Sequence, residues 1–280
     1  MFDHLESRLM ATAVSIPPGV MAGTQVVTLV LPESDGVMST ENWTATQINA
    51  VIAEVQTGLA WWEKVAAKSG VTVKFILDTN DATFPVRVPY EPISMRFSDR
   101  GQWITNWLNQ RGIFTDAYNG VKAWNESQRV RYGADGSFTI FVADSDVDAD
   151  DRFADRYFAW TYFGGPYATM TTGNAGWGQS NMDMLTAHET GHAYFALDQY
   201  NDGTAWSSYY AISPGVFKIQ NTNAIRDRPA TAPPRETSIM REGSNMKTAF
   251  LAVNTDTSSK AMVFGPDLNK NGTPDWMETP

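Results

Sequence analysis

Hydrophobic residues near the N-terminus recur with two different periods, and the changes of period predict a strand, a helix and a second strand. Residues 25–31 are β-branched and apolar, as in a buried strand. Apolar side chains then recur at helical spacing over residues 48–66, and Thr44 and Gln47 match a capping box at the start of this long helix. Alternation over residues 71–77 predicts another strand, so the sheet begins with a parallel pair.

The rest of the pattern extends this sheet and adds further helices. Helices are predicted over residues 98–111, 114–131 and 180–197, and a third strand over residues 137–143. Residues 198–263 carry scattered prolines and predict a loop-rich C-terminal lobe. Together these elements predict an α+β fold, with a mixed twisted sheet and long helices.

The helix predicted to begin at the capping-box pattern of Ser180 and Asp183 carries the sequence HETGH. His188 and His192 are four residues apart, so both imidazoles face the same side of the helix and can bind one metal ion. Glu189 can reach a water on that ion without displacing it. Zinc lowers the pKa of such a water, and a carboxylate can take its proton during attack on a carbonyl. The motif therefore predicts a catalytic zinc site.

Two histidines do not complete such a site, because catalytic zinc takes three protein ligands and keeps one position open. The third histidine of the chain, His4, lies far away in the N-terminal segment. The third ligand is therefore predicted to be an oxygen. Asp198 follows the expected end of the helix and is the first candidate; Glu236 and Glu242 are the alternatives.

The segment HETGHAYFALD, residues 188–198, resembles the metzincin zinc peptidases, whose consensus is HExxHxxGxxH. The aspartate in the final position is similar to the motif of the snapalysin-type members. The segment ALDQY, residues 196–200, is similar to the ending of the motif in the immunoglobulin-A-peptidase-like members. The resemblance implies a catalytic domain over residues 1–263, with a zinc cleft between an N-terminal lobe of about residues 1–197 and a C-terminal lobe of about residues 198–263. It also implies a methionine turn beneath the metal, for which Met240 is the candidate and a plain core methionine the alternative.

Two positions depart from the metzincin pattern. Phe195 replaces the glycine of the turn, and a bulky residue is strained in a left-handed backbone, so a shifted turn is predicted. Glu242 stands where some metzincins have a tyrosine that stabilises the transition state. Tyr200 and Arg241 are the candidates for that role here.

The resemblance further implies an edge strand before the active-site helix that pairs with an extended peptide substrate. The strand predicted for this role consists of Tyr167, Ala168, Thr169, Met170 and Thr171. Its aromatic neighbours fill the core in the simplest interpretation. The chain also has ten Trp and ten Tyr, so stacking on the sugars of a glycoprotein substrate is an alternative.

The C-terminal segment, residues 264–280, contains a twelve-residue calcium-loop pattern with Gly272 at its sharp turn. It is similar to the short calcium repeats of dockerins and thrombospondin type 3 modules. The predicted Ca²⁺ ligands are Asp267, Asn269, Asn271, Thr273, Asp275 and Glu278. Residues 144–151 alternate aspartate with other residues but lack the glycine, and are interpreted as a solvated acidic loop, with a second calcium site as the alternative.

Composition narrows the choice of partners and compartment. The net charge of −10 and pI of about 4.7 disfavour nucleic acid and anionic membranes as partners. With no cysteine there is neither a disulfide framework nor a thiolate metal site, and no apolar run reaches membrane-spanning length. No signal peptide is visible, but calcium loops of this type work at extracellular calcium levels. The expected compartment is therefore extracellular, with the protein in a mature form.

These observations predict a zinc-dependent endopeptidase with Glu189 as general base, acting on proteins or peptides. The alternative function is a calcium-stabilised extracellular adhesion or binding module that keeps an inactive metalloprotease-like fold. The intact Glu189 favours the enzyme, because a structural zinc site needs no general base.

Overall fold

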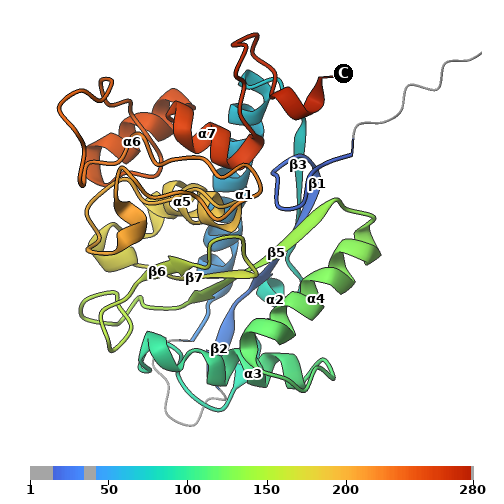
Figure 1. Ribbon diagram of the computed structural model, residues 1–280. Coiled ribbons are helices and arrows are strands. Elements are labelled where there is room, and N and C mark those ends of the chain that lie inside the picture. Colours follow the sequence, from blue (N-terminus) through green and yellow to red (C-terminus); the bar gives the residue numbers. More distant parts are fainter. Residues whose placement is uncertain (1–14, 35–41, 279–280) are drawn as a thin grey trace, which may run out of the picture.

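A five-stranded sheet forms the centre of the computed structural model, which describes residues 15–34 and 42–278 (Figure 1). The strand order is β3-β1-β5-β7-β6, and all neighbours are parallel except the edge strand β6, which runs antiparallel to β7. The strands are β1 Gly23–Val30, β3 Val73–Asp78, β5 Gly136–Ala143, β6 Ala159–Thr161 and β7 Tyr167–Thr171, with a separate parallel pair β2 Pro32–Ser34 and β4 Val86–Val88.

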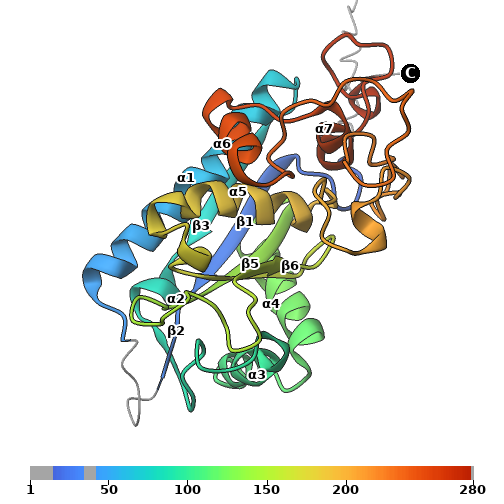
Figure 2. The same cartoon turned by 90° about the vertical axis from the view of Figure 1, so that its left-hand side faces the viewer.

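Helices cover both faces of the sheet. They are α1 Ala45–Lys68, α2 Asn80–Thr83, α3 Gly101–Asn109, α4 Ala117–Tyr132, α5 Met182–Ala193, α6 Gly243–Ala252 and α7 Thr257–Phe264. Figures 1 and 2 show α1 and α5 side by side on one face, and α3 and α4 on the other. Successive side chains of β5 point to opposite faces of the sheet and contribute to the hydrophobic core on each face. Phe138 and Ile140 pack in the cluster with α1 and α5, and Phe141 packs in the cluster with α3 and α4.

The fold is mixed α/β with a mostly parallel sheet, which agrees with the predicted class at that level. The predicted opening is confirmed: β1 and β3 are parallel, and α1 lies between them in sequence. Its capping box is also present, because Gln47 N–H donates to Thr44 Oγ1 and Thr44 N–H donates to Gln47 Oε1. The helices predicted over residues 98–111 and 114–131 are α3 and α4.

The second capping-box prediction is wrong. Helix α5 begins at Met182 after Asn181, and no side chain caps it. Asp183 accepts a hydrogen bond from the neighbouring Met184 N–H instead. The helix also ends at Ala193, four residues before the predicted end, because the backbone turns directly after the second histidine.

Two helices of the C-terminal lobe were not predicted. The loop-rich character holds for residues 198–242, but α6 and α7 follow. Both are short, at ten and eight residues, and their sequences give little apolar periodicity. Asp256 caps α7 by accepting a hydrogen bond from Ser259 N–H.

The C-terminal segment packs against the rest of the chain. The indole N–H of Trp276 donates to the carbonyl of Phe264, the last residue of α7, at 2.6 Å. In the middle of the segment, the carbonyl of Gly272 lies so close to Gly70 that a Cβ on Gly70 would meet it at 2.5 Å. The tail thus lies against the end of α1. None of the helices in the described part of the chain is long and apolar enough to span a bilayer.

Candidate metal centre

Three side chains predicted as ligands converge on one point. Helix α5 presents His188 and His192 on one face, and the turn after α5 brings Asp198 to them. The two Nε2 atoms are 3.2 Å apart, and Asp198 Oδ1 lies 3.2 Å from His188 Nε2 and 3.4 Å from His192 Nε2. All three residues are buried. His4 lies outside the described residues.

The spacing of these atoms fits a tetrahedral zinc ion. Zinc bonds of about 2.0–2.1 Å place neighbouring ligand atoms roughly 3.3–3.4 Å apart. Asp198 Oδ1 is buried and has no hydrogen-bond partner, which is costly for a carboxylate oxygen unless a cation neutralises it. The residues present therefore fit zinc as the resident metal.

Backbone carbonyls orient both imidazoles. Nδ1–H of His188 donates to the carbonyl of Ile239, and Nδ1–H of His192 donates to the carbonyl of Ala196, each at 2.8 Å. A proton held on Nδ1 leaves the Nε2 lone pair free to bind a metal, as the outer partners of metal-binding histidines commonly ensure. Because every residue has a backbone carbonyl, the sequence could not indicate that Ile239 and Ala196 supply these two.

The electrostatics of the centre favour a cation. Burial by itself lowers the pKa of His192, but the carboxylate of Asp198 more than offsets this and raises the pKa to about 9. Burial raises the pKa of Asp198, and the two histidines lower it well below its usual range. The carboxylate of Asp198 is thus negative at neutral pH, and its charge favours a cation beside it.

Glu189 lies beside the ligands and is held by a residue that the sequence did not single out. Thr161, the last residue of β6, donates from Oγ1 to Glu189 Oε2 at 2.6 Å. Glu189 is only 5% exposed, yet it lines the same cleft as both histidines. Its second oxygen is free to face that cleft, as a general base requires.

Met240 lies directly beneath the centre. A Cβ on Gly191, between the two histidines, would come within 2.7 Å of Met240 Sδ, so the thioether packs against this turn of α5. The backbone of Met240 is also tied to the ligand loop, because Gln199 N–H donates to its carbonyl at 2.9 Å. Met240 therefore packs against the helix that carries both histidines, and its role as a methionine turn stays a prediction.

A buried polar network supports this arrangement from below. Asp256 accepts from Gln199 Nε2 at 3.0 Å and from Ser238 Oγ at 2.7 Å. Ser238 Oγ in turn accepts from Met240 N–H. The loop that carries Asp198 and the turn that carries Met240 are thus fixed to the start of α7.

The alternative ligands do not reach the metal group. Glu236 accepts hydrogen bonds from the backbone and hydroxyl of Thr257, at the start of α7. Glu242 lines the cleft from the N-cap position of α6 and is exposed. In the part of the chain that the structure describes, Asp198 is the carboxylate that joins the two histidines.

The two candidates for transition-state stabilisation differ in position. Tyr200 lines the cleft together with both histidines and Glu189. Burial, and then the negative charges of Asp198 and Glu189, raise the pKa of its phenol above the usual range, so the hydroxyl stays protonated and can donate. Arg241 is not among the residues that line the cleft.

The prediction that Tyr167–Thr171 is an edge strand is wrong. This segment is β7, which pairs with β5 on one side and with β6 on the other, and all five residues are buried. Its backbone groups are used within the sheet, so they cannot pair with a substrate. The edge of the sheet at the cleft is β6, Ala159–Thr161.

The cleft has a volume of about 700 Å³ and a largely aromatic lining. Phe163 packs edge-on against His192, with ring centroids 5.2 Å apart, and against Trp206 at 5.6 Å. Trp206 is 44% exposed and presents its ring to the cleft. The remaining aromatic side chains of the lining are Tyr157, Phe158, Trp160, Tyr162, Trp177 and Tyr200.

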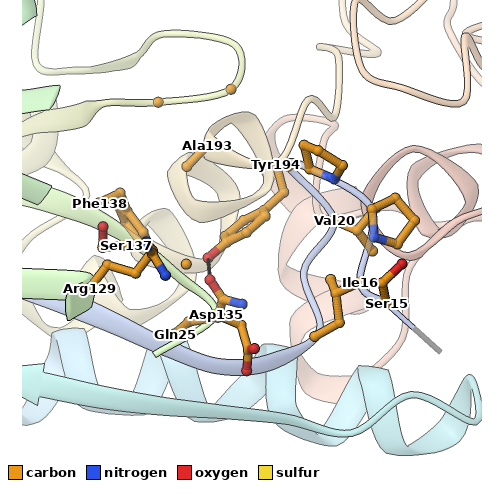
Figure 3. Close-up of a pocket in the computed structure, with 16 residues that line it drawn as sticks. Ser15, Ile16, Val20, Gln25, Arg129, Asp135, Ser137, Phe138, Ala193 and Tyr194 are labelled. Atoms are coloured by element: carbon orange, nitrogen blue, oxygen red, sulfur yellow. Dashed lines mark hydrogen bonds between the residues drawn. The ribbon is translucent and has the colours of Figure 1, made fainter. Parts of the chain in front are cut away.

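A second cavity of about 550 Å³ lies at the C-terminal end of α5 (Figure 3). Figure 3 shows Tyr194, which follows α5, pointing toward Gln25 on β1; its hydroxyl donates to Gln25 Oε1 at 2.8 Å. Arg129 and Asp135 also line this cavity. None of the predicted site residues does, so the chemistry belongs to the first cleft.

The predicted calcium loop folds back on itself. Asp267 accepts from the N–H groups of Asn271 and Gly272, and Glu278 accepts from the side-chain amides of Asn269 and Asn271. The first and last positions of the loop therefore approach the same central residues. Thr273 N–H donates to Asn271 Oδ1, and Asp275 Oδ1 accepts from Leu268 N–H.

The interpretation of residues 144–151 as a wholly solvated loop is wrong at its start. Asp144 is only 2% exposed. Gln47 Nε2 donates to its carboxylate at 3.1 Å and to that of Asp146 at 2.6 Å. The first two aspartates thus attach the loop to the start of α1, whereas Asp148 is half-buried and Asp150 is exposed.

The turn that delivers Asp198 is not shifted by the replacement of its glycine. Phe195 itself takes the left-handed conformation, with φ of 70°.

No protein-family model matches the chain, and no curated protein matches it at a significant level. The assignment of a function therefore depends on the geometry of the site.

Proposed function

We propose that this protein is a zinc-dependent endopeptidase with a metzincin-like catalytic domain. The observation that carries the proposal is the convergence of His188, His192 and Asp198 at the spacing of zinc ligands, with Glu189 in the same cleft. A structural zinc site is closed by four protein ligands, whereas three ligands and an adjacent carboxylate are typical of a catalytic one. The order of a strand, a long helix, further strands and the active-site helix supports the resemblance to this family.

The residues of the cleft divide the chemistry between them. Zinc, when bound, supplies a Lewis acid that lowers the pKa of water and polarises a carbonyl. Glu189 accepts the proton of the attacking water and returns it to the leaving amine. Thr161 holds one oxygen of that carboxylate, and the Tyr200 hydroxyl donates a hydrogen bond toward the negative charge that develops on the substrate.

The edge strand β6 supplies the binding surface for an extended peptide. It pairs with β7 on one side, and its other side has no partner strand in the described sheet. A peptide that adds to such an edge gains main-chain hydrogen bonds, and the side-chain pockets decide specificity. The aromatic lining favours protein or peptide substrates, glycoproteins included, with bulky or planar groups near the cleaved bond.

Zinc content and proteolysis test this proposal together. We expect one zinc per chain by mass spectrometry after reconstitution, and hydrolysis of casein that a chelator abolishes and added zinc restores. Stoichiometric zinc without hydrolysis of casein or of a peptide library would sink the peptidase proposal and leave the metal site standing. Failure to take up zinc at all would sink both.

Replacing Tyr200 with phenylalanine is expected to lower kcat on the order of 10²-fold, because the variant loses a donor aimed at the developing charge. KM should change little, since the ring that packs near His188 is kept. Arg241→Gln is the matched control and should leave kcat unchanged. If the arginine variant loses activity and the tyrosine variant does not, Arg241 has the role.

We also propose that Ca²⁺ binds the C-terminal loop and that the protein acts outside the cell. Calcium would replace the side-chain amides of Asn269 and Asn271 as the partner of the Glu278 carboxylate. Millimolar Ca²⁺ is expected to raise the Tm of the wild type by a few degrees, because a ligand that binds only the folded state stabilises it. The same addition should have no effect on Glu278→Gln, and an equal rise in both would rule out this loop.

A further inference from the structure

Phe195 stands at the middle of the turn that completes the metal centre. It lies three residues after His192 and three before Asp198, with φ of 70°. A β-branched or bulky side chain is disfavoured in this left-handed conformation, whereas glycine adopts it freely. Glycine would fit this backbone without strain, so the contacts of the phenyl ring have to offset the strain of the left-handed conformation.

The ring lies in a slot formed by three glycines from separate segments. A Cβ on Gly19, before β1, would come within 2.6 Å of Phe195 Cε2, and a Cβ on Gly164, after β6, would overlap Cε1 and Cζ. A Cβ on Gly215, in the C-terminal lobe, would lie 3.0 Å from Phe195 Cβ and 3.1 Å from Cγ. The ring thus touches backbone on three sides. A Cβ at Gly19 or Gly164 would force it to move, and a Cβ at Gly215 would press against its stem.

The same turn holds both the second histidine and the third ligand. Phe195 N–H donates to the carbonyl of His192 at 2.9 Å, and that carbonyl also accepts from Gly164 N–H at 2.9 Å. The next residue, Ala196, supplies the carbonyl that orients His192 Nδ1. Ser213 Oγ donates to the Phe195 carbonyl at 2.8 Å. Phe195 is therefore the point at which the N-terminal segment, the loop after β6 and the C-terminal lobe all contact the metal-binding turn.

We propose that Phe195 is a positioning residue for the metal, a proposal that rests on the zinc site of the proposed function. Its ring, fixed between Gly19, Gly164 and Gly215, anchors the turn in a conformation that the residue alone disfavours. The turn then presents Asp198 Oδ1 to the two Nε2 atoms. A glycine at this position would adopt the turn without strain. Phe195 is strained there, and the surrounding backbone holds it in place.

Substitution of Phe195 with alanine tests the proposal through metal affinity. The variant keeps the left-handed strain and loses the anchor, so Asp198 is free to leave the group. We expect zinc affinity, measured by competition with a chromogenic chelator, to fall by about 10–100-fold, as for loss of a partner that orients a ligand. The visible absorption of the Co²⁺-substituted protein should shift with the change in ligand geometry. Phe114→Ala, which removes an 80% exposed ring elsewhere, is the control and should match the wild type.

The proposal is overturned if Phe195→Ala folds, has a lower Tm, and keeps wild-type zinc affinity and Co²⁺ spectrum. That outcome would make Phe195 an ordinary packing residue. The affinity and the spectrum are read without any peptidase assay. A protein that binds zinc but cleaves no peptide therefore contradicts the proposed function and leaves this test intact.

A second variant covers the case in which Phe195→Ala does not fold. Gly215 has no left-handed backbone, so Gly215→Ala adds a methyl group against Phe195 without straining its own residue. We expect a several-fold loss of zinc affinity from this change in the wild type, and no further loss in a Phe195→Gly background, where the clash is gone. Equal losses in both backgrounds would show that Gly215 acts by another route and would overturn the slot as the anchor.

Discussion

Replacing Glu189 with glutamine is expected to lower kcat for peptide hydrolysis by about 10²–10⁴-fold, the range that a general base contributes. Glutamine has nearly the same shape and can still interact with the Thr161 hydroxyl, which lies 2.6 Å from Glu189 Oε2. It cannot accept the proton of water, however. Because Glu189 is not one of the three converging ligands, the variant should keep one zinc per chain. Steady-state kinetics and metal analysis on the same preparation measure both quantities.

Glu242→Gln provides the matched control, since Glu242 lines the same cleft but is exposed and lies outside the metal group. It should retain most of the activity. Full activity of the Glu189 variant would remove this residue from the mechanism. No peptidase activity in either the wild type or the variant, with zinc bound to both, would favour the alternative of a calcium-stabilised binding module.

Replacing Asp198 with alanine is expected to weaken zinc binding by more than the roughly 10–100-fold that loss of an outer partner costs, because a ligand itself is lost. The two histidines would remain on α5, but no other described carboxylate approaches them closely enough to substitute. Peptidase activity should fall with zinc occupancy and recover in part at high zinc. Metal content across a zinc titration, assayed alongside casein hydrolysis, tests both effects.

Asp198→Asn is a useful companion, because it keeps an oxygen at the position and removes the charge. Its zinc affinity should lie between those of the wild type and the alanine variant. Wild-type affinity in Asp198→Ala would contradict this ligand set.

Several local features of the chain were predictable from the sequence. His188, Glu189 and His192 are fixed by helical spacing alone, and the Thr44 capping box depends on residues three apart. Asp198 was predicted as the third ligand because the chain has too few histidines, and the structure places it beside His188 and His192. In each case the decisive contact lies within about ten residues of sequence.

Contacts between distant segments were not predictable. Strand order is set by pairing across the sheet, so residues 167–171 were taken for an edge strand when β6 holds the edge. The hydroxyl of Thr161 donates to Glu189, which lies 28 residues later in the sequence, and nothing in the sequence around Thr161 indicates this contact. The burial of Asp144 depends on Gln47, 97 residues earlier. The replacement of glycine by Phe195 was visible, but the three glycines that accommodate its ring come from segments far apart in the chain.

The shortness of the edge strand has a consequence for the proposed peptidase. Strand β6 has three residues, which offer about 10 Å of backbone, and the chain leaves the sheet before the left-handed pair Gly164 and Gly165. A substrate can add a strand there only where its own backbone is already free of other pairing. Cleavage of a native protein would then be governed by how often a short stretch of it opens, rather than by its amino-acid sequence alone. Thermal or chemical loosening of the target should accelerate its digestion while leaving the hydrolysis of short peptides unchanged.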